Sequence, residues 1–192
     1  MGFGDWGLRF RLGVEYVSTT DVLTGITNRM GMYTRLESLL KSRESIDGLG
    51  VMFIDLDNFK PYNDTYGHEI GDIVLQGMAK IFHEAVSDKG FVCRYGGDEF
   101  IIITYTNQRD TIEFIAKDIY ERISKTEGFI ADIQRTLHKE INIDKNNRIS
   151  CSMGISISKE FTDVNQVDDM IKKADDTLYN VKAAGKGKYI FT

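Results

Sequence analysis

The chain has few cysteines, no surplus of positive charge and no long apolar run. Its only two cysteines, Cys93 and Cys151, lie in apolar segments typical of strands, so we expect buried free thiols and no disulfide framework. A net charge of −5 excludes a surface built to neutralise many nucleic-acid phosphates. No apolar run approaches the roughly 20 residues of a membrane span, and the first residues lack a secretion signal. We therefore expect a cytoplasmic protein that binds no nucleic acid.

The length of 192 residues favours a single domain with a short extension. Leu8, Leu12 and Tyr16 recur at helical spacing, which predicts an amphipathic helix before the main body of the chain. We interpret residues 1–19 as a helical connector and residues 20–192 as one domain. An upstream sensor or signalling domain in a longer parent protein is compatible with this division.

The rest of the sequence alternates between helical and strand-like patterns. Strands, helices and a central hairpin in mixed order predict an α/β (α+β) fold with a mixed central sheet flanked by helices. Residues 126–147 are the least regular stretch and predict a peripheral excursion. The expected elements are a helix over 29–42 capped by Asn28 with Leu36, Leu39 and Leu40 inward, a buried strand over 48–54, a helix capped by Asp72, a hairpin around Gly96 and Gly97, a helix over 110–125, a half-buried strand over 149–157, a helix over 164–184 and a strand over 189–191.

Residues 94–100, with the sequence RYGGDEF, are the most informative segment. Two glycines between β-favouring runs predict a tight hairpin, and two carboxylates, Asp98 and Glu99, follow directly. Glycine at such a tip lets a phosphate come close. Taken alone, acidic residues at a hairpin tip are equally typical of a solvated turn.

A second acidic element upstream favours a functional site over a solvated turn. Asp55 follows the buried strand, and strand ends that meet would bring it beside Asp98 and Glu99. Clustered carboxylates suit hard divalent cations that also hold a triphosphate, and two such ions support an in-line phosphoryl displacement. A calcium loop is excluded because Lys60 stands where the turn requires glycine. A P-loop is excluded because residues 185–188 lack its upstream glycine and its Ser or Thr.

Five segments in order resemble the GGDEF domain, the catalytic module of diguanylate cyclases. They are residues 21–29, 55–72, 96–100, 151–156 and 174–188. The resemblance extends from about Thr20 to the C-terminus, and it implies a palm-like nucleotide-cyclase fold whose β-hairpin carries the signature. It also implies one GTP per subunit and a homodimer, in which each 3′-hydroxyl attacks the α-phosphate of the other GTP. The products would be cyclic di-GMP and two pyrophosphates.

The resemblance also assigns roles to particular residues. It implies two Mg²⁺ ions per site, with Mn²⁺ as a substitute, held by Asp55, the carbonyl of Leu56, Asp98 and Glu99. Asp98 would help to deprotonate the 3′-hydroxyl. Strand alternation directs neighbouring side chains to opposite faces, which makes Asp98 a stronger metal candidate than Glu99. Arg94 would stabilise transition-state charge; its alternative is a cross-strand pair with Glu99.

Substrate contacts follow from the same resemblance. Asn63 and Asp72 would read guanine, because an amide and a carboxylate can match the donors and acceptors of its edge. Lys182 and Lys186 would contact the β and γ phosphates. The alternative is that they are ordinary basic residues at a helix C-terminus, where the macrodipole favours positive charge. The remaining expected contacts are Asn58, Phe59, Lys60, His68, Gly96 and Gly97.

The match has departures and leaves alternatives. Many relatives carry an Arg-x-x-Asp product-inhibition site before the hairpin, but residues 87–90 read Ser-Asp-Lys-Gly here, so that inhibition is not expected. Asp72 is the residue that favours GTP over adenine nucleotides. A catalytically silent GTP-binding regulatory module is one alternative, although the signature acids are intact. A palm-type adenylyl cyclase or polymerase is the other. His83 and His138 have no expected role.

Overall fold

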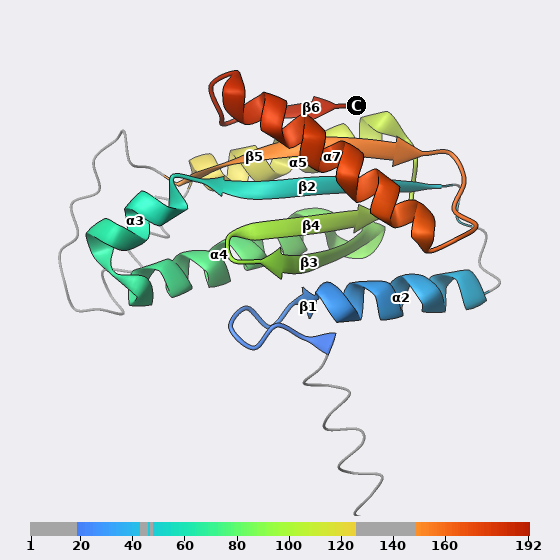
Figure 1. The fold of residues 1–192 in the computed structure, drawn as a ribbon, viewed down its shortest axis with the longest axis horizontal. Helices are drawn as coiled ribbons and strands as arrows, with labels where there is room; N and C mark the ends of the chain where they lie inside the picture. Colours follow the sequence, from blue (N-terminus) through green and yellow to red (C-terminus); the bar gives the residue numbers. More distant parts are fainter. Residues whose placement is uncertain (1–18, 43–45, 47, 126–148) are drawn as a thin grey trace, which may run out of the picture.

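A six-stranded mixed sheet organises the protein, in the order β1-β3-β4-β2-β5-β6. The computed structural model describes residues 19–42, 46, 48–125 and 149–192. The inner pairs of strands are antiparallel, and the outer pairs, β1 with β3 and β5 with β6, are parallel. The strands are β1 (Thr27–Asn28), β2 (Leu49–Asp57), β3 (Gly90–Gly96), β4 (Glu99–Thr104), β5 (Ser150–Ser158) and β6 (Tyr189–Phe191) (Figure 1). The predicted mixed sheet flanked by helices is confirmed.

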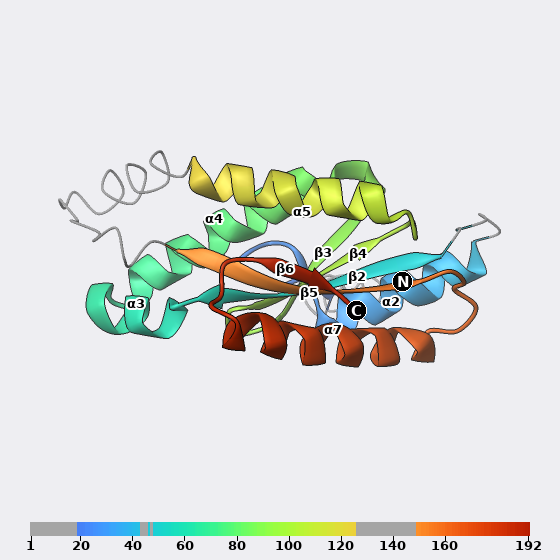
Figure 2. The same cartoon turned by 90° about the horizontal axis from the view of Figure 1, so that it is seen from above.

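Helices cover both faces of this sheet. Figure 2 shows α4 and α5 on one side and α2 and α7 on the other, with α3 near the end of β2. Alternation along β2 explains the two layers, because Met52 and Ile54 contact the α4 and α5 layer while Val51 and Phe53 contact the α2 and α7 layer. The helices are α2 (Arg29–Lys41), α3 (Phe59–Tyr66), α4 (His68–Val86), α5 (Arg109–Ser124) and α7 (Asn165–Ala183), with a 3₁₀ turn at Ser87–Lys89.

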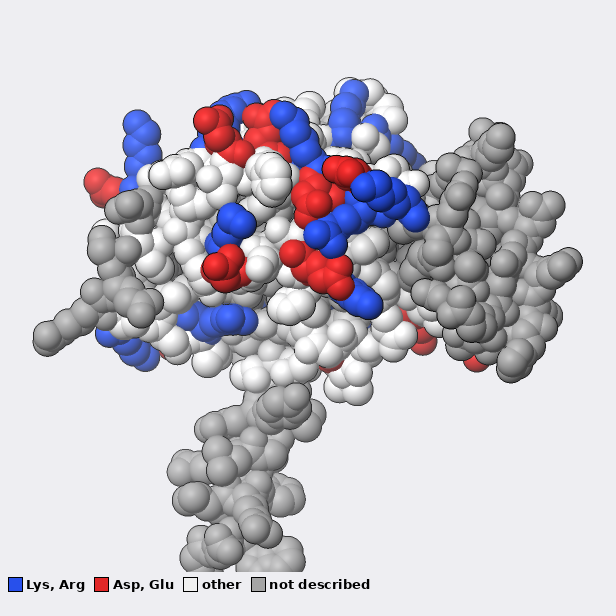
Figure 3. Space-filling model, turned by 180° about the vertical axis from the view of Figure 1, so that it is seen from behind, with Lys and Arg blue, Asp and Glu red and all other residues white. Residues whose placement is uncertain are grey.

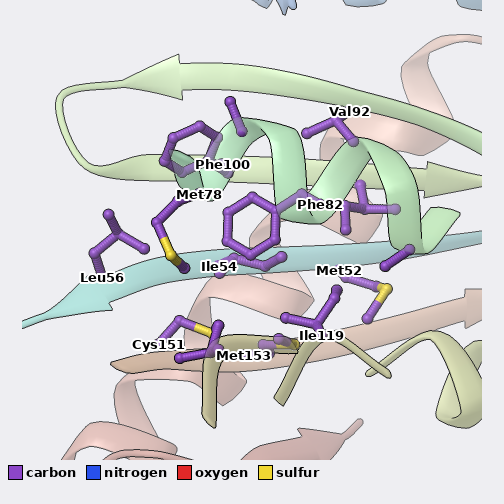
Figure 4. Close-up of a cluster of buried hydrophobic side chains, with 14 of the residues drawn as sticks. Met52, Ile54, Leu56, Met78, Phe82, Val92, Phe100, Ile119, Cys151 and Met153 are labelled. Carbon is purple, nitrogen blue, oxygen red and sulfur yellow. The ribbon is translucent and has the colours of Figure 1, made fainter. Parts of the chain in front are cut away.

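The larger hydrophobic cluster lies between the sheet and the α4 and α5 layer (Figure 4). Phe82 of α4 and Phe100 of β4 are fully buried at its centre, with ring centroids 5.1 Å apart in an edge-to-face arrangement. Ile54 and Leu56 of β2 point into the same cluster. Since side chains alternate along a strand, Asp55 between them must point to the opposite face, toward α7.

Several predicted elements are confirmed with nearly the expected bounds. The helices over 29–42, 110–125 and 164–184 correspond to α2, α5 and α7, and the last strand is β6. Asn28 caps α2 as predicted, because its side chain accepts a hydrogen bond from the amide of Gly31 at 2.9 Å. Within α2, Leu36 and Met32 are fully buried, Leu39 is partly buried and packs against the core as predicted, and Leu40 is only partly buried.

Two predicted boundaries around the acidic segment are wrong. The strand β2 does not stop at Asp55 but continues to Asp57, because that residue still pairs with Ser150 of β5. Asp72 does not cap a helix, since α4 begins at His68 and Asp72 lies exposed in its second turn. The short helix α3, with only Phe59 and Tyr62 buried, was not expected.

The strand over 149–157 was expected to be half-buried, but β5 is buried on both faces from residue 151 to residue 156. Ser152, Gly154 and Ser156 alternate with apolar residues because they lie under α7, not because they face water. A Cβ on Gly154 would lie 1.8 Å from the carbonyl oxygen of Ala174 and 2.6 Å from the amide of Leu178. Small residues on this face of β5 therefore allow α7 to approach the sheet closely.

The remaining expectations concern cysteines, charge and the undescribed segments. Cys93 and Cys151 are free and buried as predicted, and burial raises the pKa of the Cys93 thiol to about 12. Basic and acidic side chains lie side by side on the face seen in Figure 3, with no large patch of one sign there. Among the described helices, none is long and apolar enough to cross a bilayer. The predicted connector up to residue 18 and the predicted excursion over 126–147 lie outside the described residues.

Replacing Phe82 tests the importance of the central cluster. Phe82→Ala should lower the free energy of unfolding by about 3–5 kcal/mol, because it leaves a cavity beside Phe100. Phe114→Ala is the matched control, since that ring is 65% exposed on α5 and its loss should change stability by less than about 0.5 kcal/mol. Urea unfolding followed by circular dichroism measures both, and equal losses would contradict this account of the core.

Candidate functional site

The signature hairpin turns at Gly97 and Asp98, one residue later than predicted. Pairing runs from Gly90 opposite Thr104 to Arg94 opposite Phe100, and then shifts so that Gly96 lies opposite Glu99. Gly97 adopts a φ of +55°, a conformation that glycine reaches at little cost, and no atom lies within 4 Å of where its Cβ would be. The turn is therefore open to a ligand on the side where a side chain would stand.

The structure brings Asp55 together with the two signature acids, Asp98 and Glu99. Asp55 of β2 lies directly opposite Glu99 of β4, and directly opposite residues of an antiparallel pair share one face of the sheet. The amide of Leu56 donates a hydrogen bond to the carbonyl of Asp98 at 3.3 Å, which ties the hairpin turn to the end of β2. Glu99 therefore stands on the same face as Asp55, and alternation gives no reason to prefer Asp98.

Burial and neighbouring negative charge raise the pKa of two of these acids, Asp55 and Glu99. Burial raises the pKa of Asp55, the charges of Asp98 and Asp57 raise it further, and Lys182 opposes the shift. Burial also raises the pKa of Glu99, followed by the charges of Asp55, Asp175 and Asp98. The ammonium of Lys182 lies 2.6 Å from a carboxylate oxygen of Asp55. The strand ends thus form a partly buried negative centre that a cation stabilises.

The donor set fits a magnesium ion that shares its coordination with a nucleotide. No three His, Cys, Asp or Glu side chains converge into a complete metal cage within the described part of the chain. Asp55, Asp98 and Glu99 instead supply carboxylate oxygens, and Leu56, whose side chain is buried, has only its carbonyl to offer. Hard oxygen ligands from one or two carboxylates, completed by water and phosphate, are typical of Mg²⁺ sites.

The start of α3, just after the acidic end of β2, has the chemistry of an anion site. Asn58 precedes this helix in a left-handed conformation and makes no side-chain cap, which leaves the first amides of the helix without one. Its side-chain oxygen instead accepts a hydrogen bond from the ammonium of Lys186 at 3.0 Å. Lys60 is exposed in the first turn of α3, whereas the Phe59 side chain is buried and offers only its backbone. Amides at a helix N-terminus together with lysine suit phosphate.

The residues expected to read guanine lie where α3 meets α4. The Asn63 carboxamide oxygen is buried without a hydrogen-bond partner in the described structure, and it lies against Gly71, whose added Cβ would be 1.7 Å away. Asp72 is the next residue along α4 and is exposed, as is His68 at the start of this helix. The structure therefore places Asn63 next to the turn of α4 that carries Asp72.

Arg94 braces the signature turn. Its guanidinium donates two hydrogen bonds to the carbonyl of Gly97, at 2.8 and 3.0 Å, and forms an ion pair with Asp21 at 3.2 Å. The alternative pairing with Glu99 is wrong, because the register shift places Phe100 opposite Arg94. Sequence reasoning missed the role of Asp21, since its partner is 73 positions away in the chain.

Sequence reasoning also missed Asp57. This buried carboxylate accepts hydrogen bonds from Ser150 at 2.7 Å, Ser152 at 2.8 Å and the amide of Gly187 at 3.1 Å. One signal was available, because residues two apart in a strand share a face and Asp57 therefore lies on the face of Asp55. Its partners come from β5 and from the turn after α7, which no local pattern reveals.

A mixed sheet flanked by helices, with acidic strand ends beside an uncapped helix N-terminus, is the arrangement that the sequence resemblance implied, and comparison with known families tests that resemblance. The chain belongs to the GGDEF family, because the family model for the diguanylate cyclase GGDEF domain matches residues 18–188.

Individual relatives agree with this assignment. Diguanylate cyclase A of Treponema denticola is 31% identical over 176 residues, covering 90% of this chain and 44% of its own length. Response regulator PleD of Caulobacter vibrioides is 32% identical, with 91% and 36% coverage, so the chain spans less than half of either relative. The diguanylate cyclase SiaD of Pseudomonas aeruginosa, solved with its activator SiaC, has the same fold at a TM-score of 0.72 and 21% identity, with 99% and 68% coverage.

Glu99→Gln tests the cost of placing a charged Glu99 in a partly buried position among other acids, through the pH dependence of stability. A raised pKa means that the folded state binds the proton more tightly than the unfolded state, so this stabilisation is lost as the pH rises through the folded value. The substitution should therefore raise the thermal midpoint at pH 7 by about 2–4 °C, and the gain should vanish below the ordinary pKa of 4.5.

Glu113→Gln is the control for this experiment, since hydrogen bonds from Lys117 and Tyr189 lower the pKa of Glu113. Its replacement should give no gain at pH 7. Calorimetric scans from pH 4 to pH 8 compare the two variants. A gain for Glu99→Gln that does not change with pH would contradict this account of the raised pKa.

Proposed function

We propose that residues 20–192 form a diguanylate cyclase domain, which condenses two GTP into cyclic di-GMP with release of two pyrophosphates. One observation carries the proposal: Asp55 and Glu99 share one face beside Asp98, next to the uncapped start of α3. Carboxylates for a cation and amides for a phosphate are the two requirements of a site that binds a magnesium nucleotide. Family membership and the name of Diguanylate cyclase A support the same reaction.

The residues at the strand ends and the hairpin turn have separate roles in metal binding, proton transfer and nucleotide access. Two Mg²⁺ ions, or Mn²⁺ in their place, would be held by Asp55, the Leu56 carbonyl, Asp98 and Glu99. When bound, they would supply charge stabilisation at the α-phosphate and a lowered pKa for the attacking hydroxyl. Asp98 lies in the open turn, where it accepts the proton of the 3′-hydroxyl. Gly96 and Gly97 give the nucleotide access to this turn.

Phosphates and base bind on either side of α3. The backbone of Asn58 and Phe59 contacts the phosphates, together with the ammonium groups of Lys60, Lys182 and Lys186. Asn63 and Asp72 read guanine, and His68 lies beside the nucleotide at the start of α4. The position of Asn63 against Gly71, the residue before Asp72, supports this role, because it brings the two side chains to the same junction of α3 and α4.

Two subunits complete the reaction. Each domain holds one GTP, and each 3′-hydroxyl attacks the α-phosphate of the GTP held by the other subunit. Two facing copies thus form two phosphodiester bonds and release two pyrophosphates. The contacts of Arg94 with Gly97 and Asp21 favour a positioning role for this residue over direct stabilisation of the transition state. Residues 1–19 are proposed as a helical connector, and the share of each relative that the chain covers is compatible with an upstream sensor or signalling domain.

Product analysis with GTP and Mg²⁺ tests the function. Chromatography should detect a cyclic dinucleotide from the parent protein and at least about 10³-fold less from Asp98→Ala, which removes a proton acceptor and metal ligand. Asp88→Ala is the control, because Asp88 is equally acidic but exposed in the 3₁₀ turn before β3. The rate per subunit should rise with protein concentration, since turnover requires two copies.

Other outcomes would identify the alternatives. GTP that is bound but not consumed at high protein concentration would contradict the cyclase and indicate a silent regulatory module. A linear or monomeric cyclic product would indicate a different palm-type enzyme.

Asp72→Asn tests how the site reads the base. Replacing one carboxylate oxygen by an NH₂ group turns an acceptor for guanine into a donor, so kcat/KM for GTP should fall about 10²-fold. The preference for GTP over ATP should shrink by a similar factor. Asp110→Asn is the control, since Asp110 is an exposed acid in the first turn of α5. An unchanged GTP preference in Asp72→Asn would exclude this residue from base recognition.

A further inference from the structure

We infer that Asp57 and Ser152 are positioning residues that hold Lys186 against the phosphate site. The inference rests on the proposed function, because it concerns how the same site grips the triphosphate. Neither residue is expected to touch the substrate. Both act through the turn between α7 and β6, formed by residues 184–188.

The turn has an unusual backbone. Gly185, Lys186 and Gly187 follow one another in left-handed conformations, with φ values of +107°, +60° and +62°. Glycine adopts this region at little cost, but Lys186 does not, since a side chain there crowds the backbone. A lysine in that conformation persists only where surrounding contacts hold it.

One such contact is the helix-end hydrogen bond from the Lys186 amide to the carbonyl of Val181 at 3.2 Å, and Asp57 and Ser152 hold the next residue. The amide of Gly187 donates to the carboxylate of Asp57 at 3.1 Å and to the hydroxyl of Ser152 at 3.2 Å. The Ser152 hydroxyl in turn donates to Asp57 at 2.8 Å, and both side chains are buried. A buried carboxylate that accepts an amide hydrogen bond forms a strong, charge-assisted contact. The backbone just after Lys186 is therefore fixed to β2 and β5.

A second contact lies directly beside the first. Lys186 donates from its ammonium to Asn58 at 3.0 Å, and Asn58 is the residue that follows Asp57. Two consecutive residues of one segment, Asp57 and Asn58, thus bind two consecutive residues of the turn, Gly187 and Lys186. This double contact sets the distance between the lysine and the uncapped amides at the start of α3.

A purely structural role for the network would predict a different result. A general loss of stability would weaken all ligands alike. Loss of positioning at Lys186 should weaken only ligands that carry the β and γ phosphates, because the base is bound elsewhere, by Asn63 and Asp72.

Ser152→Ala tests the inference by ligand binding without turnover. With Mg²⁺ present, calorimetry should show about tenfold weaker binding of a GTP analogue with an α,β-methylene bridge, the effect of one lost charge-assisted hydrogen bond. Binding of GMP should change by less than about twofold, since GMP lacks the β and γ phosphates. Ser156→Ala is the matched control, because Ser156 is a buried serine on the same face of β5, whereas the Gly187 amide hydrogen-bonds to Asp57 and Ser152.

A double-mutant cycle with Lys186→Ala measures the coupling between the two substitutions in analogue affinity. A purely structural role for Ser152 would give no such coupling. If Ser152 acts through Lys186, removing the lysine should cost much less affinity in the Ser152→Ala background than in the parent. Asp57→Asn, which keeps the shape of the side chain, serves as a second variant and should show the same selective loss for the analogue.

The outcomes separate the inference from the proposed function. Equal losses for GMP and the analogue, additive effects of Ser152→Ala and Lys186→Ala, or no binding of the analogue by the parent would overturn the positioning role. A parent that binds the analogue with the predicted selectivity, yet forms no cyclic dinucleotide from GTP, would overturn the cyclase and leave the positioning role intact.

Discussion

The antiparallel register between β2 and β4 is the constraint on which the site depends. It places Asp55 opposite Glu99 and, by alternation, sends Ile54 and Leu56 into the core. A slip of one residue would exchange the two sets, burying the carboxylates and exposing the apolar side chains. The large apolar cluster around Phe82 therefore does more than stabilise the fold, since it fixes which side of β2 carries charge.

The site concentrates negative charge, and its neighbours compensate in different ways. Lys182 neutralises part of the charge on Asp55 through a direct ion pair. Asp57 is compensated by neutral donors, two hydroxyls and an amide, which satisfy its oxygens without adding a cation. The pKa of Glu99 is raised first by burial and then by the neighbouring acids, and the charge of Lys182 only partly opposes this. Stability is thus reduced locally where cation binding is proposed, as is common at functional sites.

Sequence reasoning recovered what depends on local pattern and missed what depends on distant contacts. The family motifs, the mixed sheet and the cap of α2 were all predictable from short segments. The hairpin turn lies at Gly97 and Asp98, one residue later than predicted, because the register between β3 and β4 shifts at Tyr95. Only the observed pairing of the two strands reveals this shift. The small residues of β5 were predicted to face solvent. Small residues are equally typical of a strand face on which a helix packs closely, so the pattern does not distinguish the two environments. The Asp57 network escaped notice because its serine partners lie 93 and 95 positions away.

The close contact between Gly154 and α7 has a consequence for the entropy of binding. With backbone atoms of Ala174 and Leu178 this near, α7 has little room to rotate or slide on β5. The same helix carries Lys182 and leads directly into the turn of Lys186. The conformational freedom of both lysine backbones is therefore given up when the protein folds and not when a ligand arrives. A nucleotide that meets such a preorganised site has only side-chain rotation left to restrict.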